Sequence, residues 1–365
     1  MWSEQQGAAI QAVLAWAKSR GGKQVFKLFG YAGSGKTTMA KEIARHVGGS
    51  VVFACFTGKA ALVLISKGCA TASTIHSLIY KVEEQPDGSH KFRLNSLSLA
   101  SVAKLIIIDE VSMVGQDLGK DLLSFGTKVL VLGDPEQLPP VHGTGYFTAG
   151  EPDVMLTEIH RQARDNPIIR MSMDVREGRK LCVGAYGDSR IITRRELDPD
   201  QVLAADQLLV GMNKTRRTCN ARIRQLNEMD GTYPIRNDRL VCLKNDRTRG
   251  LLNGSLWSTE SADAPDDSGI VKMKVRSLDD PSMKEPASVY VPREFFTGEE
   301  ASLDRNRRRN YDEFDFGYAL TVHKSQGSQW NNVMLIDESD VFREDRRKHL
   351  YTGITRAAEK ITLVQ

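Results

Sequence analysis

Short apolar runs alternate with helical stretches through the first half of the chain. Four runs rich in Val, Ile, Leu and Phe have the length and composition of buried strands. They are KQVFKLFG (23–30), SVVFACF (50–56), KLIIIDE (104–110) and TKVLVLGD (127–134). A helix-like segment, KTTMAKEIARHV (36–47), lies between the first two. Because strands that alternate with helices build βαβ units, the pattern predicts an α/β fold with a doubly wound parallel sheet.

The same alternation resumes in the second half. Strands are expected at 206–213, 238–245, 332–339 and 360–365. The polar stretch KTRRTCNARIRQLNEM (214–229) has the composition of a surface helix between the first two of them. The chain is therefore predicted to contain two α/β domains.

Two segments interrupt this order. Residues 79–95 carry a Pro-Asp-Gly turn between two partly alternating arms, which predicts a β-hairpin inside the first domain. Residues 260–310 contain the alternating runs VKMKVR (271–276) and ASVYV (287–291). This second segment predicts a small β-rich insertion that ends in a charged linker.

The distribution of charge is more informative than its total. A length of 365 residues allows two or three domains, and a hydrophobic fraction of 41% is enough for ordinary cores. The net charge of the chain is only +4. Lys and Arg nevertheless gather in the second half, at 193–196, 214–224, 305–309 and 343–348. Such clusters suit a polyanionic partner, although a solvated surface explains any one of them equally well.

The chain shows no signal for a membrane or for secretion. Its longest apolar runs have the length of strands, and MWSEQQGAAIQ (1–11) has polar residues where a secretory leader has an apolar core. The five cysteines are scattered without metal-ligand spacing. We expect a soluble cytoplasmic protein with free thiols and no membrane partner.

One glycine-rich segment predicts a nucleotide site. GYAGSGKTT (30–38) matches G-x-x-x-x-G-K-[ST] between a predicted strand and a predicted helix, as this motif requires. Its glycines let backbone N–H groups surround phosphate oxygens at a helix N-terminus. The expected ligands of the nucleotide are Gly30, Gly33, Ser34, Gly35, Lys36, Thr37 and Thr38. Lys36 would reach the β- and γ-phosphates, and Thr37 would give an oxygen to Mg²⁺.

A pair of acids follows a later strand. Asp109 and Glu110 come directly after the apolar run LIII, at the strand end where ligands bind in open α/β sheets. Asp109 is expected to hold Mg²⁺, and Glu110 is expected to orient and deprotonate the attacking water. Together with the phosphate loop, the pair predicts hydrolysis of the nucleotide and not binding alone.

A polar side chain follows the next strand as well. In VLGDPEQLPPV (131–141) an exposed turn would explain Gly133, Asp134 and the prolines. A turn leaves Gln137 unexplained, since this side chain follows a strand end and is placed to sense a γ-phosphate.

These segments and several others resemble, in order, the motifs of the superfamily 1 helicases of the 5′-to-3′ branch, the RecD-like and phage Dda-like DNA helicases. Gln6 resembles the adenine-reading glutamine that precedes motif I, and GYAGSGKTT resembles motif I itself. The later motifs are FTGKAA (56–61), STIHSL (73–78), IIDEVSM (107–113), GDPEQLPPV (133–141), LTEIHRQ (156–162), YALTVHKSQGSQ (318–329) and YTGITRA (351–357). We call the last two motif V and motif VI.

The resemblance implies a fold and a nucleotide site. It implies two RecA-like cores that bind ATP between them, with Mg²⁺ as the metal. Arg161 and Arg356 would be arginine fingers that stabilise charge on the γ-phosphate, the alternative for each being a surface salt bridge. Gln326 and Gly327 would also lie toward the nucleotide.

The resemblance also implies a track for single-stranded DNA across both cores. The side chains expected on it are Thr57, Lys59, Thr74 and His76 in the first core, and Thr321, His323 and Ser325 in the second. Phe56 replaces a proline that is usual in the family, and either stacks on a base or is buried at a strand end. The hairpin takes the place of the family's strand-separating pin, where Phe92 or His90 would wedge against a base pair, unless the hairpin is only structural.

The resemblance gives the domains expected boundaries. The first core comprises 1–78 and 96–164, with the hairpin at 79–95; the second comprises 165–259 and 311–365. The insertion at 260–310 matches the position of an SH3-like module in this branch. No acidic cluster of the nuclease type is evident, so cleavage is not expected.

The function expected from the resemblance is ATP-driven translocation on single-stranded DNA, 5′ to 3′, with unwinding of duplex. The partners would be single-stranded DNA and junctions of single- and double-stranded DNA, with replication or recombination proteins as further candidates. The protein would act as a monomer. The alternative is a DNA-stimulated ATPase switch, or a subunit of a recombination or exonuclease complex, that does not unwind DNA by itself.

Overall fold

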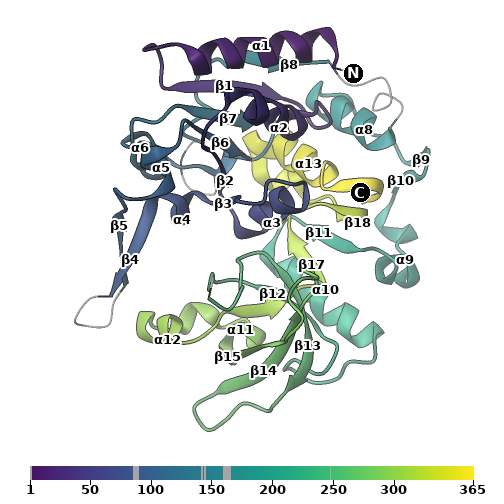
Figure 1. Ribbon diagram of the computed structural model, residues 1–365. Coiled ribbons are helices and arrows are strands. Elements are labelled where there is room, and N and C mark those ends of the chain that lie inside the picture. Colours follow the sequence, from purple (N-terminus) through teal and green to yellow (C-terminus); the bar gives the residue numbers. More distant parts are fainter. Residues whose placement is uncertain (1, 85–89, 141–142, 144, 159–165, 247) are drawn as a thin grey trace. The chain divides into compact units, whose positions relative to one another are not determined.

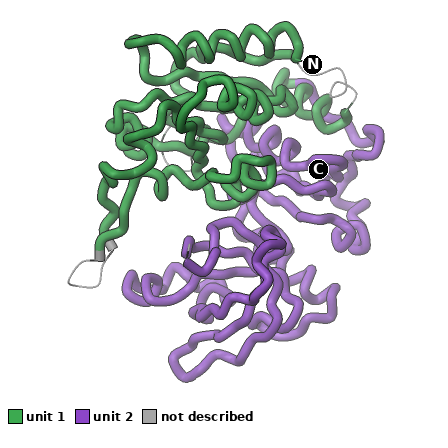
Figure 2. Tube along the Cα trace, in the orientation of Figure 1, with its two compact units in different colours: residues 1–178 green, residues 179–365 purple. Residues whose placement is uncertain are grey.

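The chain forms two compact units, Met1–Gly178 and Arg179–Gln365 (Figure 2). The computed structural model describes residues 2–84, 90–140, 143, 145–158, 166–246 and 248–365. Each unit contains one parallel sheet covered by helices (Figure 1). The α/β class predicted from the alternation of strands and helices is therefore confirmed.

The sheet of the first unit has six strands in the order β3-β2-β6-β7-β1-β8, and all neighbours are parallel. The strands are β1 (Val25–Gly30), β2 (Val51–Cys55), β3 (Ser73–Thr74), β6 (Leu105–Asp109), β7 (Val129–Gly133) and β8 (Val154–Leu156). The four predicted strands are β1, β2, β6 and β7. The other two are only two and three residues long, too short for periodicity to reveal them.

Alternate residues of these strands pack on opposite faces of the sheet. Leu28 and Leu130 belong to a core with α1 (Glu4–Lys18), α2 (Lys36–Val47) and α3 (Gly58–Ser66). Phe29 and Val131 belong to a second core with α4 (Ile75–Ile79), α5 (Leu99–Val102) and α6 (Gln116–Leu123). Helices on both faces make this a doubly wound sheet. The 3-10 helix η1 (Val111–Met113) and α8 (Pro167–Arg176) complete the described helices of this unit.

The predicted hairpin is present and projects from the first unit (Figure 1). Its strands are β4 (Tyr80–Glu84) and β5 (His90–Leu94), paired antiparallel. The turn at residues 85–89 and the side chain of His90 lie outside what the structure describes. Val82 and Phe92 face each other across the hairpin, and they are 57% and 59% exposed. The hairpin thus presents apolar side chains to solvent.

The parallel sheet of the second unit has the order β17-β11-β18-β19-β10-β9, in which only β9 is antiparallel. Its strands are β9 (Gly184–Tyr186), β10 (Ser189–Ile192), β11 (Gln207–Val210), β17 (Ala319–Thr321), β18 (Trp330–Ile336) and β19 (Ala357–Val364). The helices are η2 (Arg194–Glu196), α9 (Pro199–Leu203), α10 (Asn213–Leu226), η4 (Ser339–Asp345) and α13 (Arg346–Ile354). The predicted strands at 206–213, 332–339 and 360–365 correspond to β11, β18 and β19.

The strand predicted at 238–245 belongs to a different sheet. Five antiparallel strands, in the order β15-β14-β13-β12-β16, form a separate layer in the second unit. They are β12 (Arg239–Cys242), β13 (Leu256–Ala262), β14 (Ile270–Ser277), β15 (Ala287–Pro292) and β16 (Phe314–Phe316), with α11 (Glu294–Thr297), η3 (Glu300–Ser302) and α12 (Arg305–Asn310) beside them. This antiparallel sheet therefore extends beyond 260–310 on both sides, and the charged linker contains a helix. An apolar run such as LVC fits a parallel or an antiparallel strand, so sequence could not tell which sheet β12 joins.

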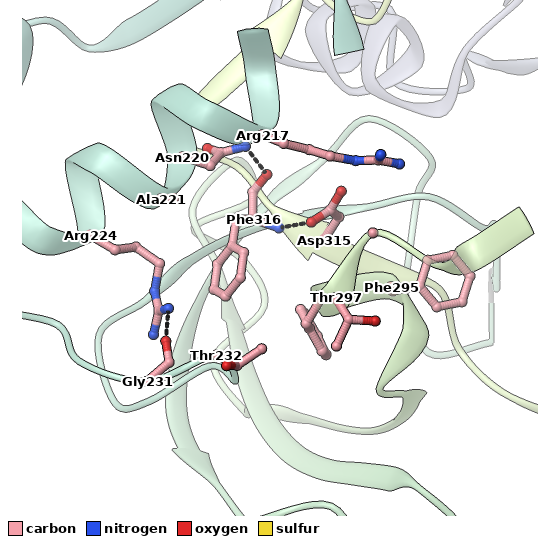
Figure 3. A pocket seen from close by; sticks show the side chains of 12 residues that line it. Arg217, Asn220, Ala221, Arg224, Gly231, Thr232, Phe295, Thr297, Asp315 and Phe316 are labelled. Atoms are coloured by element: carbon pink, nitrogen blue, oxygen red, sulfur yellow. Dashed lines mark hydrogen bonds between the residues drawn. The ribbon is translucent and has the colours of Figure 1, made fainter. Parts of the chain in front are cut away.

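Buried polar contacts join α10 to a strand of each sheet, β16 of the antiparallel sheet and β17 of the parallel one. The Asn220 amide donates to the Phe316 carbonyl at 3.1 Å and accepts from the Ala319 N–H at 2.7 Å. Figure 3 shows Asn220 and Phe316 beside a pocket of about 260 Å³ that residues of α10 and α11 line. The charged residues that line it are paired: Arg217 with Glu300, Arg224 with Asp238 and Asp315 with Arg216. Each charged side chain that lines the pocket therefore already has a partner of opposite charge within the protein.

Within the described ranges, no helix combines the length and the apolar composition needed to cross a bilayer.

Candidate nucleotide site and nucleic-acid interface

The phosphate loop requires glycine at several positions. Gly33 and Gly35 both have φ of +79°, a conformation that other residues adopt only with strain. A Cβ on Gly30 would lie 2.6 Å from Ser34 Oγ and 2.7 Å from Leu156 Cβ. Gly35 is also the N-cap of α2, so the loop leads directly into a helix N-terminus. This is the local geometry that binds phosphate through backbone N–H groups.

Lys36 lies across the loop. Its Nζ donates to the carbonyls of Gly30, at 2.6 Å, and Tyr31, at 3.0 Å. Ser34 Oγ is buried and has no hydrogen-bond partner among the described residues. A buried polar atom without a partner is uncommon and marks a place where a ligand atom or water belongs.

Gln6 is bonded to the same loop. Its Nε2 donates to the Ser34 carbonyl at 3.0 Å, and its Oε1 accepts from the Ser3 N–H at 3.1 Å. Ser3 Oγ in turn accepts from the Gln6 N–H, which completes a capping box at the start of α1. The structure thus places Gln6 beside the phosphate loop, with its amide bonded to protein; adenine recognition stays a prediction.

The loop and the acid pair meet directly. Thr37 Oγ1 donates to Asp109 Oδ2 at 2.9 Å, which joins the first turn of α2 to the end of β6. Glu110 has φ of +55° and ψ of +50°, an unfavourable conformation for a residue with a side chain. Such strain concentrates at functional sites. A hydroxyl and a carboxylate at this distance are oxygen donors of the type Mg²⁺ takes.

Gln137 remains unexplained by the turn that contains it. Asp134 Oδ1 accepts from the Glu136 N–H at 3.0 Å, and the Gln137 N–H donates to the Asp134 carbonyl at 3.2 Å, so a turn accounts for the backbone. Gln137 Oε1 is buried and has no hydrogen-bond partner within the described part of the chain. This oxygen is therefore a second polar atom placed for a ligand or water.

The threonines predicted to contact DNA in the first unit are helix caps. Thr57 Oγ1 accepts from the Ala60 N–H at 3.2 Å at the start of α3. Thr74 Oγ1 accepts from the Ser77 N–H at 3.3 Å at the start of α4. Lys59 is buried in the first turn of α3. A contact between these threonines and phosphate would therefore be made at a capped helix N-terminus.

An aromatic row connects two of the predicted DNA contacts to the hairpin. The ring centroids of Phe56 and His76 are 6.0 Å apart, those of His76 and Tyr80 5.9 Å, and those of Tyr80 and Phe92 6.0 Å. Tyr80 also donates from its hydroxyl to Asp121 at 2.5 Å, which ties β4 to α6. Sequence reasoning did not select Tyr80. The available signal was an aromatic residue at the start of the predicted hairpin, only four positions after His76.

Motif V forms a buried turn in which a side chain is bonded to the backbone of the same motif. Ser325 is 0% exposed, and its hydroxyl donates to the Val322 carbonyl at 2.7 Å. Gln326 is buried as well, and Gly327 has φ of +76°. In this conformation the Ser325 hydroxyl stabilises its own turn, and its contact with DNA stays a prediction. Thr321 and His323 are partly exposed.

The lysine of motif V is bonded across the second unit. Lys324 Nζ donates to Asn253 Oδ1, in the segment between β12 and β13, at 2.6 Å. Burial lowers the pKa of Lys324 from its ordinary value. The segment that carries the predicted DNA contacts is therefore attached to the antiparallel sheet.

Arg356 follows α13 and is buried. Its guanidinium donates to the Thr352 carbonyl at 3.0 Å, to the Ser328 carbonyl at 3.2 Å and to Thr355 Oγ1 at 3.2 Å. All three acceptors are neutral, so the surface salt bridge considered as the alternative is not what holds this side chain. Arg161, the other predicted finger, lies outside the described residues.

The phosphate loop, the acid pair and the parallel sheet give the first unit the architecture of a P-loop nucleotide-binding domain. A family model described as "AAA domain" matches residues 1–196, and a model for the UvrD-like helicase C-terminal domain matches residues 316–364. The chain belongs to the superfamily 1 helicases of the 5′-to-3′ branch, as the order of its motifs predicted.

Two curated relatives and one solved structure illustrate the relationship. The ATP-dependent RecD2 DNA helicase of Deinococcus radiodurans is 30% identical over 371 residues, which cover 93% of this chain and 46% of the relative. The ATP-dependent DNA helicase dda of enterobacteria phage T4 is 30% identical over 190 residues, or 48% of this chain and 43% of the relative. In both comparisons the match spans less than half of the relative's length.

The solved structure is that of Pif1 helicase from Bacteroides in complex with ADP-AlF3 and single-stranded DNA. It has a TM-score of 0.58 at 18% identity, covering 99% of this chain and 92% of that one. The likeness confirms the fold, with two RecA-like cores.

Proposed function

We propose that this protein is an ATP-dependent DNA helicase, which translocates 5′ to 3′ on single-stranded DNA and separates duplex ahead of it. The observation that carries the proposal is the 2.9 Å hydrogen bond between Thr37 and Asp109. It brings the phosphate loop to the acid pair, which is the combination needed to hydrolyse a nucleoside triphosphate. The helicase relatives and the order of the motifs supply the DNA part of the proposal.

In the proposed reaction, the first unit binds and positions ATP. Lys36 exchanges its loop carbonyls for the β- and γ-phosphates, and Gln6 lies beside the loop to contact adenine. Glu110 takes the proton of the attacking water, and the Gln137 amide orients that water against the γ-phosphate. Thr37 and Asp109 fit Mg²⁺, which when bound would neutralise charge on the β- and γ-phosphates.

Motif VI carries a proposed arginine finger. Arg356 stabilises charge on the γ-phosphate in the transition state, as Arg161 does from the first unit. The Arg356 guanidinium is held by two carbonyls and a hydroxyl, all of them neutral. This supports the role, because the guanidinium can leave these acceptors for phosphate oxygens without breaking an ion pair. Gln326 and Gly327 directly precede Ser328, the residue of motif V whose carbonyl accepts a hydrogen bond from Arg356.

The DNA track is sequence-independent in this proposal. The N-termini of α3 and α4, at Thr57 and Thr74, bind phosphates of the DNA backbone. Phe56 and His76 stack their rings on bases. In the second unit, Thr321 and His323 are the proposed DNA contacts. Contacts to phosphates and stacked bases hold any sequence, as a moving motor requires.

The hairpin separates the strands at a junction. Phe92 is exposed at the end of the aromatic row and stacks on the first base pair. The antiparallel sheet from β12 to β16 is the inserted module, so we place its boundaries near residues 239 and 316 instead of 260 and 310.

Strand displacement by the isolated protein tests the proposal. Duplexes with a 5′ or a 3′ single-stranded tail are incubated with ATP and Mg²⁺, and Lys36→Ala is the matched control. The 5′-tailed duplex should be unwound by wild type and not by the variant. ATP hydrolysis stimulated by DNA without any displacement would contradict the helicase assignment.

A further inference from the structure

Three rings from three separate segments of the second unit pack together. His323 belongs to motif V, Phe342 to η4 and His349 to α13. Phe342 and His349 are stacked, with centroids 4.0 Å apart and planes at 13°. His323 lies 5.4 Å from Phe342 and 5.9 Å from His349. We call His323, Phe342 and His349 the ring cluster.

His349 acts in this cluster as a packing ring. It is 1% exposed, and its Nε2 has no hydrogen-bond partner among the described residues. Burial, with a smaller effect of His323, lowers the pKa of His349 to about 3. The imidazole is therefore neutral at ordinary pH, and its contribution is the flat surface that it presents to Phe342.

Phe342 is held firmly from its other side. A Cβ on Gly211 would lie 3.1 Å from Phe342 Cε2, so the ring fits closely against the end of β11. The next residue, Arg343, has φ of +45° and ψ of −105°, an unfavourable conformation that turns the chain toward α13. A shift of the Phe342 ring toward β11 would bring it against Gly211.

A second contact joins motif V to α13. The Arg356 guanidinium donates to the carbonyls of Ser328 in motif V and Thr352 in α13. Between the two contacts α13 lies tightly on the sheet, since a Cβ on Gly353 would lie 2.7 Å from Leu335 Cδ2 and 3.3 Å from Val322 Cγ2. Motif V is thus connected to the segment from η4 to Arg356 at two places, by the ring cluster at one and by the Arg356 guanidinium at the other.

We propose that His349 is a positioning residue that couples DNA binding to ATP hydrolysis. It acts through Phe342 to hold His323, which lies on the proposed DNA track, at a fixed distance from Arg356. DNA that moves His323 therefore moves α13 and the guanidinium with it. The inference rests on the proposed function, because it gives His323 to DNA and Arg356 to the γ-phosphate.

The test compares His349→Ala with His349→Phe. The first variant removes the stacking surface and the second keeps it. Two quantities are measured: the ratio of ATP hydrolysis with and without single-stranded DNA, and the change in DNA affinity caused by ADP-AlF3. The change in DNA affinity measures the coupling as a binding free energy, which is reciprocal between the two ligands, and the hydrolysis ratio is a separate kinetic readout of the same proposed connection. Leu363→Ala, which removes a buried side chain outside the ring cluster, controls for general destabilisation.

In His349→Ala the stimulation ratio should fall about fivefold or more, the lower end of ordinary coupling between sites. The effect of ADP-AlF3 on DNA affinity should fall in parallel, while hydrolysis without DNA stays unchanged. His349→Phe and Leu363→Ala should both behave as wild type. Unchanged coupling in His349→Ala, or loss of coupling in a folded His349→Phe, would overturn the inference.

If His349→Ala does not fold, Phe342→Leu takes its place, since it removes the flat ring and keeps much of the volume. It should show the same loss, and normal coupling would overturn the inference. A wild-type protein without any stimulation by DNA would instead contradict the proposed function itself. The two failures are therefore distinguishable.

Discussion

Thr37 and Asp109 are joined by a hydrogen bond of 2.9 Å between Oγ1 and Oδ2, although 71 residues lie between them in the sequence. The bond fixes the start of α2 against the end of β6, so the phosphate loop and the acid pair form one site. Because Glu110 follows Asp109 directly, the position of the proposed general base is set by the same contact.

Glu110→Gln should stop hydrolysis and spare binding. The amide keeps the shape of the side chain but cannot accept the proton of water, so the DNA-stimulated turnover should fall by about 10²- to 10⁴-fold. Steady-state hydrolysis and nucleotide titration measure the two effects. Turnover close to wild type would show that Glu110 is not the base.

Arg356→Lys tests whether the proposed finger needs the forked guanidinium or only a positive charge. The lysine keeps the positive charge but lacks the fork that bonds Ser328 and Thr352 together, so turnover should fall toward the 10³-fold loss typical of an absent finger. Nucleotide affinity, measured with unhydrolysed analogue, should change little. Loss of affinity with normal turnover at saturation would refute the finger role.

Phe92→Ala should impair unwinding more than hydrolysis. Phe92 is exposed on the hairpin, so its removal leaves the cores intact while the surface that meets a base pair is lost. Leu97→Ala is the matched control, because Leu97 is 92% exposed and lies beyond β5. Strand displacement per ATP hydrolysed is the quantity to compare. Equal values for both variants and wild type would return the hairpin to a structural role.

Arg224→Ala should destabilise the second unit. Arg224 and Asp238 form a buried pair at 2.9 Å, so the variant leaves an unpaired buried carboxylate at a cost of about 3–5 kcal/mol. Arg222→Ala, on the exposed side of the same helix, should change the free energy of unfolding by less than about 0.5 kcal/mol. Urea denaturation measures both. Similar small losses in the two variants would mean that the buried pair contributes little.

The ring cluster also predicts a dependence of stability on pH. Folding lowers the pKa of His349 from 6.5 to about 3, so the unfolded chain binds more protons between these values. The contribution of neutral His349 is therefore present above pH 6.5 and is lost as pH falls toward 3, by at most about 1.4 kcal/mol per pH unit. His349→Phe should show a shallower loss of stability than wild type between pH 6.5 and 4. Parallel curves would mean that His349 is not buried as a neutral ring.

The sequence predicts the elements with strong apolar runs and the motifs with fixed spacing. β1, β2, β6 and β7 have continuous apolar segments because both faces of the sheet are covered, and the loop 30–38 has its motif between a strand and a helix. β12 was assigned to the wrong sheet because an apolar run carries no information about its neighbours. The bond from the Ser325 hydroxyl to the Val322 carbonyl was not predicted, because a hydroxyl in a sequence does not reveal whether it bonds a ligand or its own backbone.

Contacts between distant segments leave no pattern in the sequence. His323, Phe342 and His349 are spread over 27 positions, and nothing in their spacing indicates a common cluster. Tyr80 is different, because its four-residue distance from His76 is visible in the sequence. Periodicity reports which face of an element is buried, and tertiary packing decides what lies against it.

Translocation itself is measured most directly by displacement of streptavidin from a biotinylated single-stranded oligonucleotide, with ATP and Mg²⁺ present. A motor that moves 5′ to 3′ runs into a block at the 3′ end. Wild-type protein should release streptavidin from 3′-biotin and not from 5′-biotin, and Glu110→Gln should release it from neither. Equal release from both ends, or faster release from 5′-biotin, would contradict directional movement toward the 3′ end.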